Sequence, residues 1–196
     1  MSRLLTNLTI TMAAVAAGCG VEHKIHSASG AASTRSVVPK VATPVDQAFL
    51  IERDSAGPIR LGMPREKAAK LGGFTVSPAT LRLEGKAAPV LRFEHSGEVL
   101  AVAEMTSDRL SRIRVLNPRF ATSEGVRVGT TARELEKQYG PGKVFTGKGT
   151  VCAAFRKAPG RVFCFRSVPD LLVKPDWKKV AARNPVVEVI QVVLVK

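Results

Sequence analysis

The sequence predicts an α+β domain of two fused helix-plus-antiparallel-sheet units, with about three short helices, eight to ten strands and one disulfide hairpin. Three observations lead to this prediction. A short strand–glycine–helix motif occurs twice, runs of β-prone residues follow each copy, and two cysteines lie symmetrically about a turn. The domain is expected over residues 47–196, with repeat-like halves at about 47–117 and 118–196.

The N-terminal residues predict export and a lipid anchor. Residues 1–18 join a short cationic start to a mostly apolar stretch that is too short to span a bilayer. The closing Ala-Ala-Gly-Cys tetrapeptide ends at Cys19. It resembles the lipobox of bacterial lipoproteins, in which this cysteine is acylated on sulfur and becomes the first mature residue. Cys19 is therefore the predicted lipidation site. Ordinary signal cleavage, with Cys19 left as a stray thiol, is the alternative. Because Gly20 follows the cysteine, the resemblance implies sorting to the outer membrane.

Residues 19–46 predict a flexible tether between the anchor and the domain. The segment contains a Ser-, Ala- and Gly-rich run, and Pro39 and Pro44 interrupt regular structure. His23 and His26 have a spacing that metal ligands can adopt, but the segment offers them no further ligands. We therefore expect no metal site here.

The repeated motif occupies residues 59–64 (Ile-Arg-Leu-Gly-Met-Pro) and residues 126–131 (Val-Arg-Val-Gly-Thr-Thr). After the first copy, a helix is expected to open at Pro64, with Ala68 and Leu71 facing inward. Strands are then expected at residues 80–85, 90–95, 98–105 and 110–116. A chance similarity of two generic strand–glycine–helix junctions remains the alternative.

After the second copy, Thr131 and Glu134 have the spacing of a capping box, and the helix that they open is expected to bury Ala132, Leu135 and Tyr139. A cysteine hairpin, a short helix near residues 175–183 and a strand at residues 186–195 follow. This last strand is almost continuously apolar, which predicts a central and buried position.

The cysteine hairpin predicts a disulfide. Residues 151–156 and 161–166 are expected to form two strands around a turn centred on Ala158, which places Cys152 and Cys164 opposite each other on one face. Export from the reducing cytosol favours the same bond. The alternative is a pair of free core thiols. The folded region holds no third cysteine and only one histidine, so no metal site is predicted.

Residues 110–116 (Leu-Ser-Arg-Ile-Arg-Val-Leu), residues 124–130 and a C-terminal strand behind Trp177 together resemble the RpoE-regulated lipoprotein family of Gram-negative envelopes. The likeness covers about residues 105–196. It implies an acylated N-terminal cysteine and a domain of unknown function, with no catalytic or binding residues to carry over. More distantly, the tandem plan is similar to the small lipoprotein of the outer-membrane barrel-assembly machinery and to the β-lactamase-inhibitor protein fold, which are binding modules without catalysis.

The net charge of +14 is partly carried by arginines that alternate with apolar residues along expected strands. These are Arg60, Arg82, Arg92, Arg112, Arg114 and Arg127. If the strands share one sheet, Arg82, Arg92, Arg112 and Arg114 are candidates for binding anions such as lipopolysaccharide phosphates or peptidoglycan carboxylates. The alternative is that they only keep a sheet face solvated. Nucleic acid is not an expected partner, because the protein is exported and lacks an array of stacking aromatics.

No catalytic motif occurs in the sequence, and no cofactor is expected. His95, with Glu94 and Glu98 nearby, is the one imaginable acid–base group. We therefore expect a non-catalytic, lipid-anchored protein on the periplasmic face of the outer membrane that acts by binding, as a scaffold, an assembly accessory or an inhibitor. A binder of anionic glycan or lipopolysaccharide is the alternative, and a hydrolase that depends on His95 is the third possibility.

Overall fold

The structure is a computed structural model that describes residues 46–83, 86–147, 149–166 and 169–194. These residues belong to one compact unit. The predicted signal peptide and all but the last residue of the predicted tether lie outside them. Cys19, His23 and His26 are therefore also outside the described residues.

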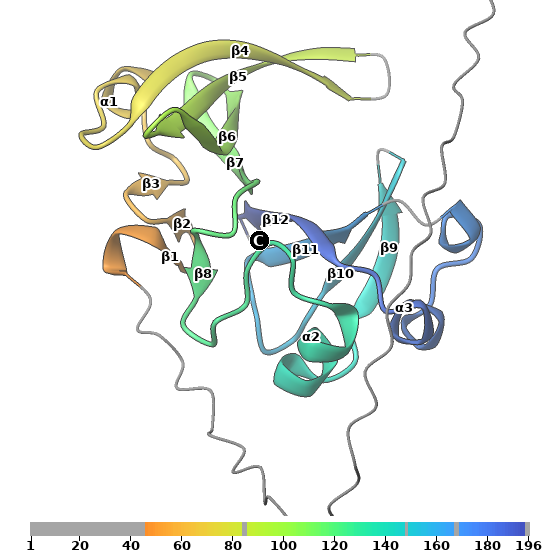
Figure 1. The fold of residues 1–196 in the computed structure, drawn as a ribbon. Coiled ribbons are helices and arrows are strands. Elements are labelled where there is room, and N and C mark those ends of the chain that lie inside the picture. The colour runs from red at the N-terminus through yellow and green to blue at the C-terminus, as the bar shows by residue number, and fades with distance from the viewer. Residues whose placement is uncertain (1–45, 84–85, 148, 167–168, 195–196) are drawn as a thin grey trace, which may run out of the picture. The chain divides into compact units, whose positions relative to one another are not determined.

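Within the described residues, three α-helices and twelve strands form the predicted α+β fold (Figure 1). The helices are α1 (Arg65–Ala69), α2 (Ala132–Tyr139) and α3 (Trp177–Arg183), with short 3₁₀ helices η1 (Gln47–Phe49) and η2 (Pro169–Leu171). The long strands are β4 (Thr75–Leu83), β5 (Lys86–His95), β6 (Glu98–Thr106), β7 (Arg109–Val115), β9 (Lys143–Gly147), β10 (Thr150–Ala154), β11 (Arg161–Phe165) and β12 (Val187–Val193). The short strands are β1 (Leu50–Ile51), β2 (Ser55–Ala56), β3 (Ile59–Arg60) and β8 (Ala121–Thr122).

The number of strands exceeds the eight to ten that were predicted. The short strands have two residues each and are too brief to produce an alternating pattern in the sequence. They form a separate mixed sheet in the order β3-β2-β1-β8. The strand predicted at residues 80–85 also begins earlier, at Thr75. It passes through Pro78, which an edge strand such as β4 tolerates because its free edge needs no N–H donor.

The large sheet is antiparallel throughout and has the strand order β4-β5-β6-β7-β12-β11-β10-β9. This order consists of two four-stranded meanders that meet where β7 pairs with β12 (Figure 1). Each meander follows one copy of the strand–glycine–helix motif along the chain. The two predicted units are thus both present and share one continuous sheet.

The backbone hydrogen bonds of the motif are the same in both halves. In the first half, the Gly62 amide donates to the Leu110 carbonyl at 2.7 Å, and the Leu110 amide donates to residue 63 at 2.9 Å. In the second half, the Gly129 amide donates to the Val187 carbonyl and the Val187 amide donates to the Thr130 carbonyl, each at 2.8 Å. Both glycines have positive φ angles, 78° and 92°, which other residues adopt only with strain. The similarity of the two motifs is therefore structural and not a coincidence of sequence.

The pairing of β7 with β12 relates the halves by an approximate twofold axis. Because Leu110 corresponds to Val187, residue 113 corresponds to 190 and residue 115 to 192. In the sheet, Ile113 pairs with Val192 and Val115 pairs with Ile190. Replacing each residue by its counterpart in the other half turns one of these pairs into the other, as a twofold axis requires. Arg114 pairs with Gln191 between them, and these two equivalent residues lie at the axis.

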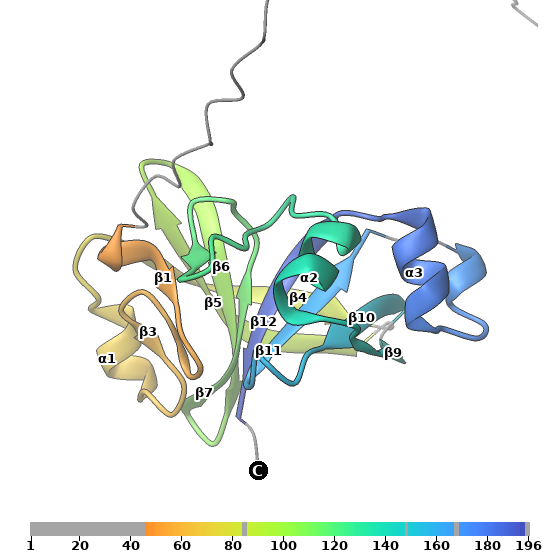
Figure 2. The same ribbon diagram turned by 90° about the horizontal axis from the view of Figure 1, so that it is seen from below.

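One face of the large sheet carries the hydrophobic core. Its fully buried side chains include Phe93, Ile113, Phe163 and Ile190. The views in Figures 1 and 2 agree that α2 and α3 lie on one side of β10, β11 and β12. Buried residues of both helices belong to the same core cluster, and so does Ala68 of α1.

The helix expected after Thr131 is confirmed as α2. The Thr131 side chain accepts from the Glu134 amide, and the Glu134 carboxylate accepts from the Thr131 amide at 2.8 Å, which completes the predicted capping box. Ala132, Leu135 and Tyr139 are buried as expected.

The prediction for β12 is right in position and wrong in burial. The strand is central, between β7 and β11. Val187, Ile190 and Val192 are buried, whereas Glu188 is exposed and Gln191 is half-buried. The apolar run is thus buried on one face of the sheet only, because the other face does not carry the core.

Among the helices of the described ranges, none is both long enough and apolar enough to span a membrane.

Candidate functional site

The sheet face opposite the core is the candidate site. Across β5, β6, β7 and β12, the paired residues Arg92, Val102, Arg114 and Gln191 form one row of this face. Their neighbours along each strand, such as Phe93 and Ile113, point into the core instead. We call the face that carries this row the outer face.

Only three of the four predicted anion-binding arginines share the outer face. Arg92 and Arg114 belong to its first row, and Arg112 lies two residues from Arg114 on the same strand. Arg82 lies on the opposite face. Ser77 pairs with Arg92 and so shares the outer face, and side chains alternate between faces along a strand. Arg82 is an odd number of residues beyond Ser77 on β4, which places it on the other face.

The other two strand arginines lie outside the large sheet. Arg60 belongs to β3 in the small sheet, and Arg127 forms a bridge with Ala121. The expectation of a single arginine-lined sheet is therefore corrected.

The outer-face arginines are paired with carboxylates. Arg114 Nε contacts Glu104 Oε1 at 2.7 Å, and Arg112 Nη1 contacts Glu104 Oε2 at 3.2 Å. Arg92 Nη2 lies 2.6 Å from Glu94 Oε1. The side chains of Arg114 and Glu104 are only 11% and 16% exposed, so this pair is held firmly in place. Sequence reasoning missed Glu104 because its position opposite Arg112 follows from strand register.

The predicted disulfide is present. Cys152 pairs with Cys164 across β10 and β11, and Sγ is bonded to Sγ. The register confirms that the hairpin is centred on Ala158. Gln191 Nε2 donates a hydrogen bond to Cys164 Sγ at 3.0 Å. Both cysteines lie on the outer face, and neither belongs to the main core cluster.

The twofold relation gives this hydrogen bond a counterpart in the other half. Arg114 pairs with Val102 as Gln191 pairs with Val162. Glu104 lies two residues after Val102 in β6, as Cys164 lies two residues after Val162 in β11, so the two positions are equivalent. The strand pairing also has an irregularity directly after each of them. The Gln191–Cys164 hydrogen bond therefore stands where the first half has the Arg114–Glu104 ion pair.

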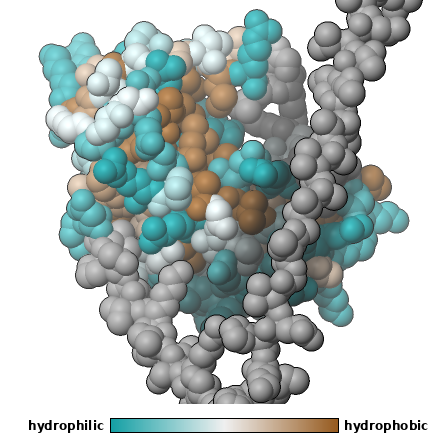
Figure 3. Space-filling model, in the orientation of Figure 1, coloured by the Kyte–Doolittle hydropathy of each residue, from teal (hydrophilic) through white to brown (hydrophobic). Residues whose placement is uncertain are grey.

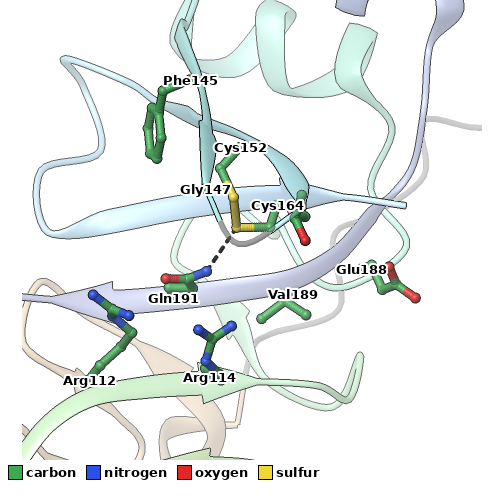
Figure 4. A pocket seen from close by; sticks show the side chains of 10 residues that line it. Arg112, Arg114, Phe145, Gly147, Cys152, Cys164, Glu188, Val189 and Gln191 are labelled. Carbon is green, nitrogen blue, oxygen red and sulfur yellow. Dashed lines mark hydrogen bonds between the residues drawn. A yellow bond between two sulfur atoms is a disulfide. The ribbon is translucent and has the colours of Figure 1, made fainter. Parts of the chain in front are cut away.

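A cavity of about 220 Å³ lies over this part of the outer face. Its lining includes Arg112, Arg114, Phe145, Cys152, Cys164 and Gln191. Figure 4 shows the two arginines on β7 along one side and the disulfide with Phe145 along the other, with Gln191 between them. The cavity thus brings together cationic, aromatic and sulfur groups from four strands of the sheet.

A second polar cluster surrounds Tyr139 at the end of α2. Its hydroxyl donates to Glu124 Oε2 at 3.0 Å and lies 3.2 Å from Thr122 Oγ1. Arg161 Nη1 lies 3.5 Å from the same Glu124 oxygen. Burial, together with the Glu124 charge, raises the pKa of Tyr139 to about 12. Partial burial opposes ionisation of Glu124, but hydrogen bonds from Thr122, its own backbone and Tyr139, with the Arg161 charge, hold its pKa below the usual value.

The structure places His95 opposite Glu98 across the β5–β6 hairpin. His95 Nδ1 lies 2.7 Å from the Gly73 carbonyl oxygen. Glu94 is engaged by Arg92, and Glu98 accepts from Asn117 at 3.4 Å. The described residues also contain no group of three or more His, Cys, Asp or Glu side chains placed to hold a metal ion.

No known protein family and no curated protein matches the sequence. The fold is similar to the crystal structure of the uncharacterized protein YfeY from Escherichia coli, with a TM-score of 0.51 and 16% sequence identity. The match covers 74% of this chain and 99% of that chain. At this identity the likeness concerns the fold alone, and it extends over nearly a whole domain and not over a single repeat.

Proposed function

We propose that this chain is a non-catalytic, lipid-anchored binding protein of the Gram-negative envelope, which acts as a scaffold, an assembly accessory or an inhibitor. The observation that carries the proposal is the outer face, a sheet surface that is not used for the core and that contains a cavity. The proposal places the domain on the periplasmic face of the outer membrane, anchored through Cys19. The disulfide supports an oxidising compartment.

The composition of the outer face favours a protein partner. The face combines cations with carboxylates, as in the Arg92–Glu94 and Arg114–Glu104 pairs, and it adds the partly exposed Phe145. On the side of the molecule seen in Figure 3, hydrophobic residues also lie between hydrophilic ones. Arginine and aromatic side chains are enriched on surfaces that bind other proteins.

Binding of an anionic glycan or lipopolysaccharide is the second candidate, and one observation favours it. Two guanidinium groups, Arg112 and Arg114, share the Glu104 carboxylate, and Arg112 Nε is buried without a hydrogen-bond partner among the described residues. A phosphate or carboxylate group could accept from that nitrogen. Arg82 plays no part in this candidate site, because it lies on the other face of the sheet.

The anchor is tested by metabolic labelling with a fatty acid. We expect the wild-type protein to incorporate the label and to fractionate with the outer membrane, and Cys19→Ala to lose the label. Labelling that survives Cys19→Ala, or a wild-type protein without label, contradicts the anchor.

The binding surface is tested by introducing a photocrosslinking amino acid at Arg92 or Arg112 on the outer face, with Lys178 on α3 as the control position. We expect one protein to be captured in intact cells from the two outer-face positions and not from Lys178. Equal capture from all three positions refutes the role of this face.

The glycan alternative makes a separate prediction. Binding of purified lipopolysaccharide or peptidoglycan fragments should weaken with salt and with Arg112→Gln combined with Arg114→Gln. Capture of these polyanions without any protein partner would favour the alternative over the main proposal.

A further inference from the structure

The disulfide occupies an unusual place for a bond that only strengthens a core. Both cysteines lie on the outer face and belong to the lining of the cavity, apart from the main hydrophobic cluster. The two cysteines are 3% and 2% exposed, so the cavity is the route by which a reagent reaches them from the described surface. Figure 4 shows the bond at the wall of this cavity, next to Gln191.

The two sulfurs are not equivalent. Cys164 Sγ receives the hydrogen bond from Gln191 Nε2, whereas no such bond to Cys152 Sγ is found among the described residues. A disulfide sulfur is a weak acceptor and a thiolate is a strong one, so this bond strengthens if Cys164 becomes a thiolate. The environment therefore favours Cys164 as the sulfur that departs with the electron pair.

In the other half of the sheet, the position equivalent to Cys164 is occupied by Glu104, an anionic residue. At the equivalent site, Arg114 donates to the Glu104 carboxylate at 2.7 Å. A thiolate at Cys164 would thus take the place of an anion, with Gln191 as the donor in the place of Arg114.

The charges around the cavity balance in number. Arg114 pairs with Gln191 across the central strands, and Arg112 also lines the cavity. Their two positive charges are matched in number by the carboxylates of Glu104, which both arginines contact, and of Glu188, which lines the cavity. Figure 4 shows the Glu188 carboxylate pointing away from the disulfide. The hydrogen bond from Gln191, and not a net charge, therefore distinguishes Cys164 from Cys152.

Opening the bond would not release the hairpin. β10 is paired on both sides, with β9 and β11, and β11 is paired with β10 and β12. The backbone ladder and the core thus hold the strands in place in the dithiol form, so the bond can open and close within the folded domain.

We propose that Cys152–Cys164 is a thiol-exchangeable disulfide that is opened by a thiolate entering the outer-face cavity. The incoming thiolate attacks Cys152 Sγ and forms a mixed disulfide. The Cys152–Cys164 bond breaks, and its electron pair leaves on Cys164 Sγ. A second thiolate attacks the incoming sulfur, so that Cys152 departs as a thiolate and the two external thiols leave as their own disulfide. The net result is a two-electron reduction of the protein by two thiols, and the reverse reaction oxidises a thiol pair.

The kinetic test follows reduction of the disulfide in the folded protein at increasing glutathione concentration. We expect a rate that rises linearly with thiolate concentration and is insensitive to low urea. Gln191→Leu should slow the reaction about fivefold, because the leaving thiolate loses its donor. It should also favour the oxidised form about tenfold, which is about 30 mV. Gln138→Leu, a change at an exposed glutamine of α2, should alter neither value.

Two results would overturn the proposal. One is a rate that saturates with thiol and rises steeply with urea, because the bond would then open only through unfolding. The other is an unchanged rate and an unchanged equilibrium in Gln191→Leu. Running the assay in parallel with a cysteine-containing peptide shows whether a small thiol or a polypeptide thiol is the better reactant.

Single-cysteine variants give a measurement that does not depend on reduction kinetics. In Cys152→Ala, the remaining Cys164 thiol should titrate about one pH unit lower than the Cys152 thiol does in Cys164→Ala, as followed by the pH dependence of alkylation. Adding Gln191→Leu should remove the difference. Equal thiol pKa values in the two single variants would contradict the assigned roles of the sulfurs.

Discussion

Tyr139→Phe isolates the hydrogen bonds of the polar cluster at the end of α2. Tyr139 is 5% exposed, and its ring packs against those of Phe155 and Phe163, with ring centroids 5.6 and 5.8 Å away. Phenylalanine keeps these contacts and removes the hydroxyl that donates to Glu124 at 3.0 Å. A hydrogen bond to a charged acceptor contributes about 1.5–3 kcal/mol. We therefore expect a loss of about 2 kcal/mol in the free energy of unfolding at neutral pH.

The same bond predicts a pH dependence with a definite sign. In the unfolded chain the phenol loses its proton near pH 10, whereas the folded protein keeps it until about pH 12. Between these values the unfolded state binds fewer protons, so the tyrosine's contribution to stability falls as pH rises. The difference between wild type and Tyr139→Phe should narrow by about 1.3 kcal/mol between pH 9 and pH 11.

The assay is direct because the chain contains one tyrosine. Its phenolate absorbance in the folded protein reports the pKa, and urea unfolding of both proteins reports the stability difference. Glu124→Gln is the matched control, since it keeps an acceptor but removes the charge. Its phenol should titrate below the wild-type value and still above pH 10, because burial, the larger cause, remains. A folded-state midpoint near pH 10, or a stability loss under about 0.5 kcal/mol in Tyr139→Phe, would refute the reasoning.

Three further changes should lower the free energy of unfolding, each measured by urea denaturation. Gly160→Ala should cost more than about 2 kcal/mol, because Gly160 has φ 78° and an added Cβ would overlap the Arg53 carbonyl oxygen. Replacing Cys152 and Cys164 together by alanine should cost about 3 kcal/mol, since the bond closes a loop with a sequence separation of 12. Thr131→Ala removes the cap of α2 and should cost about 1 kcal/mol.

The glycine prediction has a matched control in Gly97→Ala. Gly97 has a similar φ of 79° but no atom within 4 Å of an added Cβ, so it should show the backbone penalty alone, about 1–2 kcal/mol. Equal losses at the two glycines would mean that the close approach of Arg53 has no energetic effect. For the cap, an unchanged free energy of unfolding in Thr131→Ala would contradict a contribution from the capping box.

The features that the sequence determined by itself are local ones. The disulfide register followed from two strands joined by a short turn, and the capping box followed from residues three apart. The glycines of the repeated motif could be recognised because both precede a helix start, and in the structure both adopt positive φ. In each case the partners are close in the chain, so spacing alone specifies their geometry.

The tertiary structure alone decided which arginines share a face and what they contact. Side chains alternate with a period of two along a strand, so the odd spacing between Ser77 and Arg82 moves Arg82 to the opposite face. The cavity depends on the pairing of Arg114 with Gln191, residues that are remote in sequence and meet only where the two halves join. No local pattern encodes that register. It results from burying both halves in one core, which is why the sequence determined the repeated units and only the assembled sheet determined the surface they form together.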